Sequence, residues 1–250
     1  MRPEAVDWSS IGPLPIVSPY NRGKRSLTWA ERVEAYAALP KRGLIVSAEL
    51  VTPVVHAEEG LTHLDSILSA GTLTTHPVAS HFPGPACCLP LPLGLAWVSP
   101  EGRPLWACSP LVATTEAVTS REYWHKRYPS HRAEFGDKQS ALTSAGRYRE
   151  YRTPIHAESV SSLHAVCIGN HEEIERLLAT VSHIGKKGSM GYGRVARWTV
   201  VESDHTLEDV LAFRVVPLAA LVDHDSTSPP RGWTPPYWFA PWWLPCRVPV

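Results

Sequence analysis

Runs of apolar residues, several of them alternating with polar ones, predict five β-strands. These runs cover residues 43–51, 88–98, 105–112, 163–168 and 195–201. The second and third runs are joined by Ser-Pro-Glu-Gly-Arg, which has the composition of a hairpin turn. We therefore expect these two strands to pair as an antiparallel hairpin.

Two helices are predicted from capping residues and from residues that end helices. A capping-box pattern beginning at Thr28 opens an amphipathic helix that Pro40 ends. Thr62 is placed to cap a short helix over residues 64–70, which we expect to close at Gly71.

A third helix is predicted to begin after Asn170, because Glu173 follows at the spacing of a capping box. Apolar residues then recur at i, i+3, i+4 and i+7, which gives this helix one apolar face. They are Ile174, Leu177, Leu178 and Val181.

Four of the predicted strands and the last two predicted helices follow in the order strand, helix, strand, strand, helix, strand. This is the split βαβ arrangement of ferredoxin-like folds and of RNA-recognition modules. We therefore predict an α+β, ferredoxin-like (RRM-like) domain in two halves, with an N-terminal extension, an insertion between the halves and an irregular tail rich in Pro and Trp. In chain order, the extension, first half, insertion, second half and tail cover residues 1–42, 43–118, 119–154, 155–225 and 226–250.

The tail combines prolines, which disfavour regular structure, with aromatic residues, which disfavour disorder. We therefore expect it to cover apolar surface on the body or on a neighbouring subunit.

A glycine-rich basic loop separates the third helix from the last strand. Residues 184–194 read Ile-Gly-Lys-Lys-Gly-Ser-Met-Gly-Tyr-Gly-Arg. Glycine permits positive φ and close approach of a ligand, and Lys186, Lys187 and Arg194 add positive charge with no acid between them. The loop lacks the Gly-Lys-Ser/Thr ending of a P-loop, and it follows a helix instead of opening one as a dinucleotide fingerprint does. It predicts a phosphate-binding loop; the alternative is a helix C-cap at Gly185 followed by a flexible turn.

Charge is unevenly distributed along a chain whose formal net charge is zero. Residues 21–42, 121–152 and 185–197 each carry a net charge of +4, so the remainder carries −12. Concentrated basic segments on a neutral protein are typical of nucleic-acid binding. The alternative is that these segments are ordinary solvated faces.

The insertion has an unusual composition, with six aromatic residues interleaved with eight basic ones. Aromatic rings can stack on bases while guanidinium groups neutralise phosphates. An extra hairpin with a hydrophobic underside and a charged top is the alternative interpretation.

Cysteine usage and hydropathy indicate the compartment. The five cysteines are odd in number and lack zinc-ligand spacing, so we expect buried thiols in a reducing compartment. The first residues show no apolar signal-peptide core, and no apolar run approaches the roughly 20 residues of a membrane span. We expect a cytoplasmic protein that makes no membrane contact.

Three stretches together support a family resemblance. They are the loop at residues 184–195, the predicted first helix within residues 62–68, and the late Pro-Pro-Tyr-Trp at residues 235–238. With the order of elements, they resemble the RAMP superfamily of CRISPR RNA-binding proteins. The chain looks most like the Cas-five-type subunit of type IV systems, often called Csf-three, over roughly residues 43–240.

The resemblance implies a non-enzymatic RNA-binding subunit of a type IV effector ribonucleoprotein, an antiviral defense complex. Such a subunit holds the 5′ handle of the CRISPR RNA (crRNA) and nucleates a backbone of Cas-seven-type subunits beside a large subunit. The complex reaches target DNA by base pairing, while protein reads backbone and shape. No metal or cofactor is implied.

Candidate RNA-binding residues come from the loop and from the insertion, which lies where relatives carry an RNA-gripping thumb. Those of the loop are Gly185, Lys186, Lys187, Gly188, Ser189, Gly191, Tyr192, Gly193 and Arg194. Those of the insertion are Lys126, Arg127, Arg132, Lys138, Arg147 and Arg149.

Two other functions fit parts of the sequence. A Cas-six-type, metal-independent endoribonuclease needs a base near the ribose 2′-OH, and His56 or His63 could supply it. A protein-interaction scaffold would use the aromatic tail. Because twelve histidines place some near any groove by chance, we expect no catalytic residue.

Overall fold

The computed structural model describes residues 35–56, 62–75, 89–127, 149–221, 228–235, 237 and 240–248, and the structural statements below concern these residues. A five-stranded antiparallel sheet forms the body, with the strand order β2-β5-β8-β1-β9. Its strands are β1 (Arg42–Leu50), β2 (Thr62–His63), β5 (Pro110–Ala113), β8 (Ser162–Gly169) and β9 (Val195–Glu202).

The neighbouring strands β8, β1 and β9 are those that the hydrophobic pattern predicts most clearly. Alternate residues of β1, from Leu44 to Ala48, are fully buried, because successive side chains of a strand point to opposite faces of a sheet. Leu44 lies opposite Cys167 and Ala48 opposite Leu163, so the apolar faces of β1 and β8 coincide. The predictions of strands over residues 43–51, 163–168 and 195–201 are confirmed to within one or two residues.

Two helices, α2 (Leu64–Thr75) and α3 (His171–Leu178), cover this apolar face. The Asn170 side chain accepts a hydrogen bond of 3.0 Å from the backbone N–H of Glu173, which confirms the predicted cap. The predicted end of α2 at Gly71 is wrong, since the helix continues to Thr75. A Cβ at Gly71 would lie 2.9 Å from the carbonyl oxygen of Leu177, so this glycine allows the two helices to approach closely instead of ending one of them.

The predicted hairpin over residues 88–112 is present, but its strands are shorter. β3 (Leu95–Val98) pairs with β4 (Pro104–Trp106) as a separate two-stranded sheet, while β5 joins the body. The run divides after Trp106 because the carbonyl oxygens of Trp106 and Cys108 accept hydrogen bonds from Arg214. Pro110, at the start of β5, has no N–H to continue a ladder.

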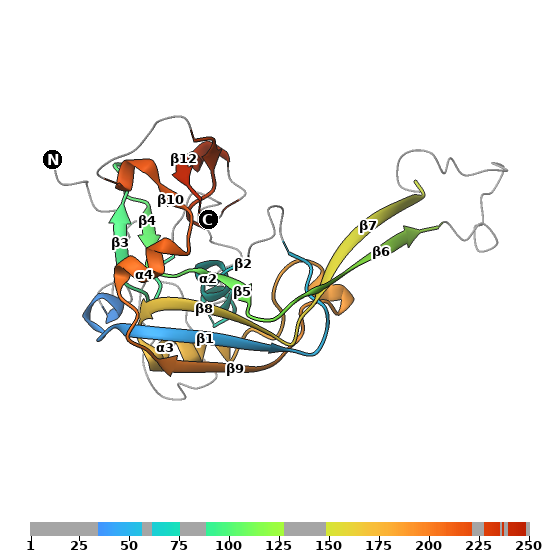
Figure 1. Ribbon diagram of the computed structural model, residues 1–250, viewed down its shortest axis with the longest axis horizontal. Helices are drawn as coiled ribbons and strands as arrows, with labels where there is room; N and C mark the ends of the chain where they lie inside the picture. Colours follow the sequence, from blue (N-terminus) through green and yellow to red (C-terminus); the bar gives the residue numbers. More distant parts are fainter. Residues whose placement is uncertain are drawn as a thin grey trace.

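The insertion begins and ends in a long antiparallel hairpin. β6 (Val118–Lys126) pairs with β7 (Tyr151–Ser159) from Val118 opposite Ser159 to Lys126 opposite Tyr151. Figure 1 shows this hairpin extending away from the body beyond the ends of β1 and β8. Most side chains of the strands β6 and β7 are exposed, and within these two strands only Ile155 and Ala157 are buried.

The C-terminal part of the chain forms a second core against the β3–β4 hairpin. Its elements are α4 (Leu207–Ala212), β10 (Val216–Pro217), β11 (Pro230–Arg231), β12 (Leu244–Arg247) and the short 3-10 turns Leu218–Ala220 and Ala240–Trp242. Leu105, Trp233 and Cys246 are buried in this core. The described part of the tail therefore covers the body, and its strands β11 and β12 form a small three-stranded sheet with β10, where the sequence predicts irregular structure for the tail. Figure 1 shows this part beside β3 and β4.

Helix hydropathy and the cysteines can be compared with the sequence predictions. None of the helices that the structure describes is long and apolar enough to cross a membrane. Cys108, Cys167 and Cys246 are buried free thiols, as the sequence predicts for those three positions. The predicted helix over residues 28–39 lies largely outside the described residues.

Candidate nucleic-acid interface

The glycine-rich loop folds back on itself between α3 and β9. Its backbone adopts positive φ at Gly185, Lys187, Gly191 and Gly193, and a single 3-10 turn spans Gly188–Met190. A Cβ at Gly193 would lie 1.9 Å from the carbonyl oxygen of Ile184, whose own N–H donates to Gly193 O at 2.8 Å. Gly193 is therefore required where the two ends of the loop meet.

Backbone hydrogen bonds hold the loop against the segment that follows β1. Lys186 N–H donates to Val55 O at 2.6 Å, and Gly193 N–H donates to Pro53 O at 2.8 Å. The Thr52 hydroxyl donates to Gly191 O at 2.7 Å and accepts from Arg194 N–H at 2.9 Å. The loop is therefore fixed at both ends and in the middle, while its tip is exposed.

The cations of the loop point into solvent without acidic partners. Lys186, Lys187 and Arg194 are exposed, and none of them forms an ion pair within the part of the chain that the structure describes. Arg197, which belongs to the same basic segment, differs because it pairs with Glu49. Uncompensated positive charge at this tip attracts anions such as phosphate.

The hairpin packs against the loop at its base. The Tyr192 hydroxyl donates a hydrogen bond to the Glu122 carboxylate, and the Lys187 ammonium lies 5.6 Å from the centre of the Trp124 ring. A small apolar cluster beneath them includes Val55, Ile155 and Ala157, with Tyr192 packed against it. Two basic segments that are separate in the sequence therefore meet in space.

The hairpin face toward the loop, here called the inner face, carries further aromatic and basic groups. Trp124 and Tyr151 contact edge to face with ring centres 5.2 Å apart. The Lys126 ammonium lies 5.9 Å from the Tyr151 ring. From the loop outward, the order is Lys187, Trp124, Tyr151 and Lys126, so two contacting rings lie between two cations.

The opposite face of the hairpin carries a second group of this kind. The guanidinium of Arg152 lies 3.7 Å from the centre of the Tyr123 ring, and that of Arg121 lies 5.2 Å from it. These contacts orient both arginines along the exposed ring.

The other predicted residues of the insertion divide into two groups. Lys126, Arg127 and Arg149 are exposed near the far end of the described strands. Arg132, Lys138 and Arg147 lie outside the described residues. In the loop, Ser189 is exposed at the tip and Gly188 is half-buried.

The two candidate histidines lie in different environments. His56 is mostly buried between the Thr62 hydroxyl at 3.1 Å and the Glu158 carboxylate at 3.3 Å. Burial lowers the pKa of His56, and the charge of Glu158 partly opposes this shift. His63 is 9% exposed and stacks on Tyr237 with ring centres 4.1 Å apart, and burial lowers the pKa of His63 to about 4.

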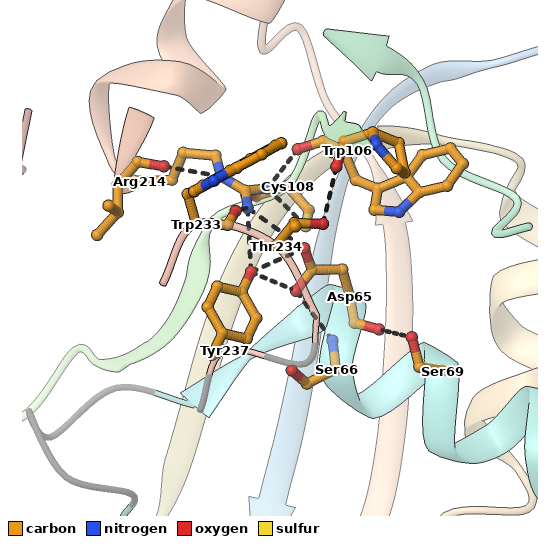
Figure 2. Close-up of polar contacts among 11 residues, drawn as sticks. Asp65, Ser66, Ser69, Trp106, Cys108, Arg214, Trp233, Thr234 and Tyr237 are labelled. Carbon is orange, nitrogen blue, oxygen red and sulfur yellow. Dashed lines mark hydrogen bonds and ion pairs between the residues drawn. The ribbon is translucent and has the colours of Figure 1, made fainter. Parts of the chain in front are cut away.

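A buried polar cluster that sequence reasoning missed connects the tail to the body (Figure 2). The fully buried Arg214 guanidinium pairs with Asp65 at 3.3 Å and donates to the carbonyl oxygen of Trp233 at 2.8 Å. The Tyr237 hydroxyl donates to Asp65 at 2.8 Å. Burial, reinforced by the charge of Asp65, raises the pKa of Tyr237 well above its ordinary value, so this hydroxyl remains a donor.

Only one sequence signal marks this cluster. Arg214 is the single charged residue within the apolar run over residues 213–222. Its partner Asp65 lies 149 positions away, so no local pattern could pair the two.

Comparison with known proteins adds a family match. A family model described as CRISPR type IV associated protein Csf3 matches residues 121–247, which include most of β6, all of β7, the glycine-rich loop and most of the tail. No curated protein matches the chain.

Proposed function

The chain belongs to the Csf3 family of CRISPR type IV associated proteins, and we propose that it grips CRISPR RNA with its glycine-rich loop and hairpin. Family membership makes it a subunit of a type IV CRISPR complex. We propose further that the subunit is non-catalytic and holds the 5′ handle of the RNA, and that it acts in the cytoplasm.

The proposed fold is the ferredoxin-like RAMP fold. The strand order β5-β8-β1-β9, with α2 following β1 and α3 joining β8 to β9, supports this assignment. Such an order arises when two βαβ units interleave in one antiparallel sheet. The β6–β7 hairpin is then inserted between the second and third strands of the fold and takes the place of a thumb.

One observation carries the RNA assignment. The loop-tip cations, which form no ion pair within the described residues, lie beside the paired rings and the outer cation of the inner hairpin face. Basic groups neutralise phosphates, while aromatic rings stack on bases whatever their sequence. This combination suits single-stranded RNA, because the bases of a duplex are already stacked on one another.

Each part has a distinct role in the proposal. Lys186, Lys187 and Arg194 neutralise consecutive phosphates at the loop tip. Trp124 and Tyr151 stack on bases that follow along the hairpin. The remaining partners are Cas-seven-type backbone subunits, a large subunit and target DNA, which the complex reads by base pairing with the RNA.

The non-catalytic assignment rests on the environments of the two histidines. A general base must come within hydrogen-bond reach of the ribose hydroxyl, directly or through one water. His63 is stacked under Tyr237, and His56 is engaged with Thr62 and Glu158. Incubation of the protein with repeat RNA in EDTA should leave the RNA intact; a specific cut that is lost in His56→Ala would establish the endoribonuclease function instead.

The central experiment is purification of the protein from a host that carries the whole CRISPR locus, followed by sequencing of the RNA that remains bound. We expect CRISPR RNA with a defined 5′ end. The affinity of the purified protein for that RNA should fall steeply with salt, with a log–log slope of about −0.7 for each phosphate contacted. Absence of RNA from the preparation and absence of binding to the repeat would favour the scaffold function, in which the tail is the binding surface.

A further inference from the structure

A polar depression lies where the hairpin leaves the body, next to the glycine-rich loop. It has a volume of about 380 Å³, within the range of small-molecule sites (roughly 300–1,000 Å³). Three segments form its wall: the end of β1 with the residues after it, the link from β5 to β6, and the turn from β7 to β8. Leu50 N–H donates to Ser161 O at 2.9 Å, which joins two of these segments.

The wall combines hydroxyl groups with one carboxylate. Thr115, Ser159 and Ser161 contribute hydroxyls, Glu116 contributes the acid, and Pro53 and Val160 add apolar surface. A hydroxyl both donates and accepts hydrogen bonds, whereas an ionised carboxylate only accepts. The strongest hydrogen bonds available here therefore go to a ligand that presents N–H or O–H donors to the carboxylate.

The Glu116 carboxylate is free to accept such donors. Nearby acids are engaged, since Glu122 accepts from Tyr192, Glu158 lies against His56 and Glu49 pairs with Arg197. Glu116 is exposed and has no ion-pair partner among the residues that the structure describes. An unpaired acid beside a basic loop repels phosphate, so this position is unsuited to a second phosphate site.

Thr52 belongs both to the depression and to the loop contact. It lines the depression, and its hydroxyl is hydrogen-bonded to Gly191 O and Arg194 N–H. In a nucleotide, the base and its phosphate are separated by one ribose. The depression and the loop meet at Thr52, so the two sites suit the base and the phosphate of the same or a neighbouring nucleotide.

We propose that this depression holds a guanine base of the bound RNA, with Glu116 accepting hydrogen bonds from its Watson–Crick edge. The proposal rests on the function proposed above, because the loop must hold the phosphate. Guanine presents N1–H and the N2 amino group side by side, which matches the two oxygens of a carboxylate. Adenine and cytosine each present one amino group beside an acceptor nitrogen, and uracil presents one N–H between two carbonyl oxygens. Single-stranded RNA allows a base to turn out of the stack and expose this edge.

The test compares fluorescein-labelled octauridine with octamers in which a single guanosine, adenosine, cytidine or inosine replaces uridine at each position in turn. Fluorescence anisotropy measures each dissociation constant at fixed salt. We expect guanosine at one or more positions to strengthen binding about tenfold, as a bidentate contact to a base edge does elsewhere. Inosine, which lacks the N2 amino group, should retain only part of that gain.

The variant Glu116→Gln should abolish the preference for guanosine and leave the affinity for octauridine unchanged or slightly higher. Glu175→Gln, an exposed acid on α3, is the matched control and should retain the preference. Equal binding of all octamers, or a guanosine preference that persists in Glu116→Gln, would overturn the base pocket while leaving the RNA grip intact. Failure of every octamer to bind would overturn both proposals.

Discussion

The hydroxyl of Tyr192 in the glycine-rich loop donates a hydrogen bond to the carboxylate of Glu122 on the hairpin, 70 positions away in the chain. This hydrogen bond is the largest cause of a raised pKa at Tyr192, so the hydroxyl remains protonated and continues to donate. The contact sets the position of the loop tip relative to the inner hairpin face. The relationship gives the first of five predictions.

Tyr192→Phe should loosen the loop without unfolding the protein, because the ring remains and only the hydrogen bond is lost. Such a bond contributes about 1 kcal/mol, equivalent to roughly fivefold in a local opening equilibrium. Hydrogen exchange of the amides in residues 187–193 should therefore accelerate about fivefold. Tyr123→Phe, on the opposite hairpin face, is the control, and equal exchange in both variants would contradict the linking role of Tyr192.

Removing both lysines of the loop tip should weaken RNA binding and also reduce its dependence on salt. Each lost phosphate contact changes the log–log slope by about 0.7 for single strands, so Lys186→Ala with Lys187→Ala should reduce the slope by about 1.4. Anisotropy titrations between low and moderate salt measure this difference. The double variant Arg42→Ala with Arg247→Ala removes the same charge from sites away from the loop, and it should leave the slope nearly unchanged; an equal change in both would indicate a general charge effect.

The two glycines near the end of the loop should respond differently to alanine. Both have positive φ, which costs a residue with a Cβ about 1 kcal/mol or more. A Cβ at Gly191 meets no atom of the described residues within 4 Å, whereas one at Gly193 collides with the carbonyl oxygen of Ile184. Gly193→Ala should therefore lower the urea midpoint of unfolding and the RNA affinity more than Gly191→Ala does, and equal effects would show that the loop end can rearrange.

Truncation of the buried ion pair should destabilise the whole protein. Arg214→Met leaves Asp65 charged and fully buried, a situation that typically costs about 3–5 kcal/mol. Urea unfolding measures this loss. Arg42→Ala breaks the exposed pair with Glu202 and should cost less than about 1 kcal/mol. Similar losses for the two variants would mean that Asp65 finds other partners or becomes protonated.

Stability should decrease on acidification below neutral pH because of His63. Its folded pKa of about 4 lies below the ordinary value of 6.5, so between these values the unfolded chain binds a proton that the folded chain does not. The free energy of unfolding therefore falls as pH falls through this window, by about 3 kcal/mol in total for a shift of this size. His56, whose pKa is also lowered, acts in the same direction.

His63→Phe tests this assignment because phenylalanine can keep the stacking on Tyr237 and has no titrating group. The buried Nδ1 of His63 has no hydrogen-bond partner among the residues that the structure describes, so its loss leaves no described donor or acceptor unsatisfied at that atom. Unfolding free energies at pH 4.5 and pH 7 should differ less in the variant than in the wild type. An unchanged difference would assign the acid sensitivity to other groups.

Local sequence patterns were enough to predict the features that depend on a single strand or helix. The alternation in β1 placed Leu44, Val46 and Ala48 in the core, since the period of a strand is two. Asn170 caps α3 through a bond to a residue only three positions away. The prediction from Gly71 was wrong, because glycine can end a helix or let two helices pack closely, and only the position of α3 separates these roles.

The sequence by itself determined the main strands, the cap of α3 and the presence of a basic glycine-rich loop, because each depends on residues that are neighbours in the chain. Tertiary structure alone decided that the loop meets the hairpin through Tyr192 and Glu122. It alone paired Asp65 with Arg214 and placed Glu116 in the wall of the same depression as Thr52. These contacts join residues far apart in sequence, and their geometry follows from how the sheet, the hairpin and the tail pack together, which no local pattern encodes.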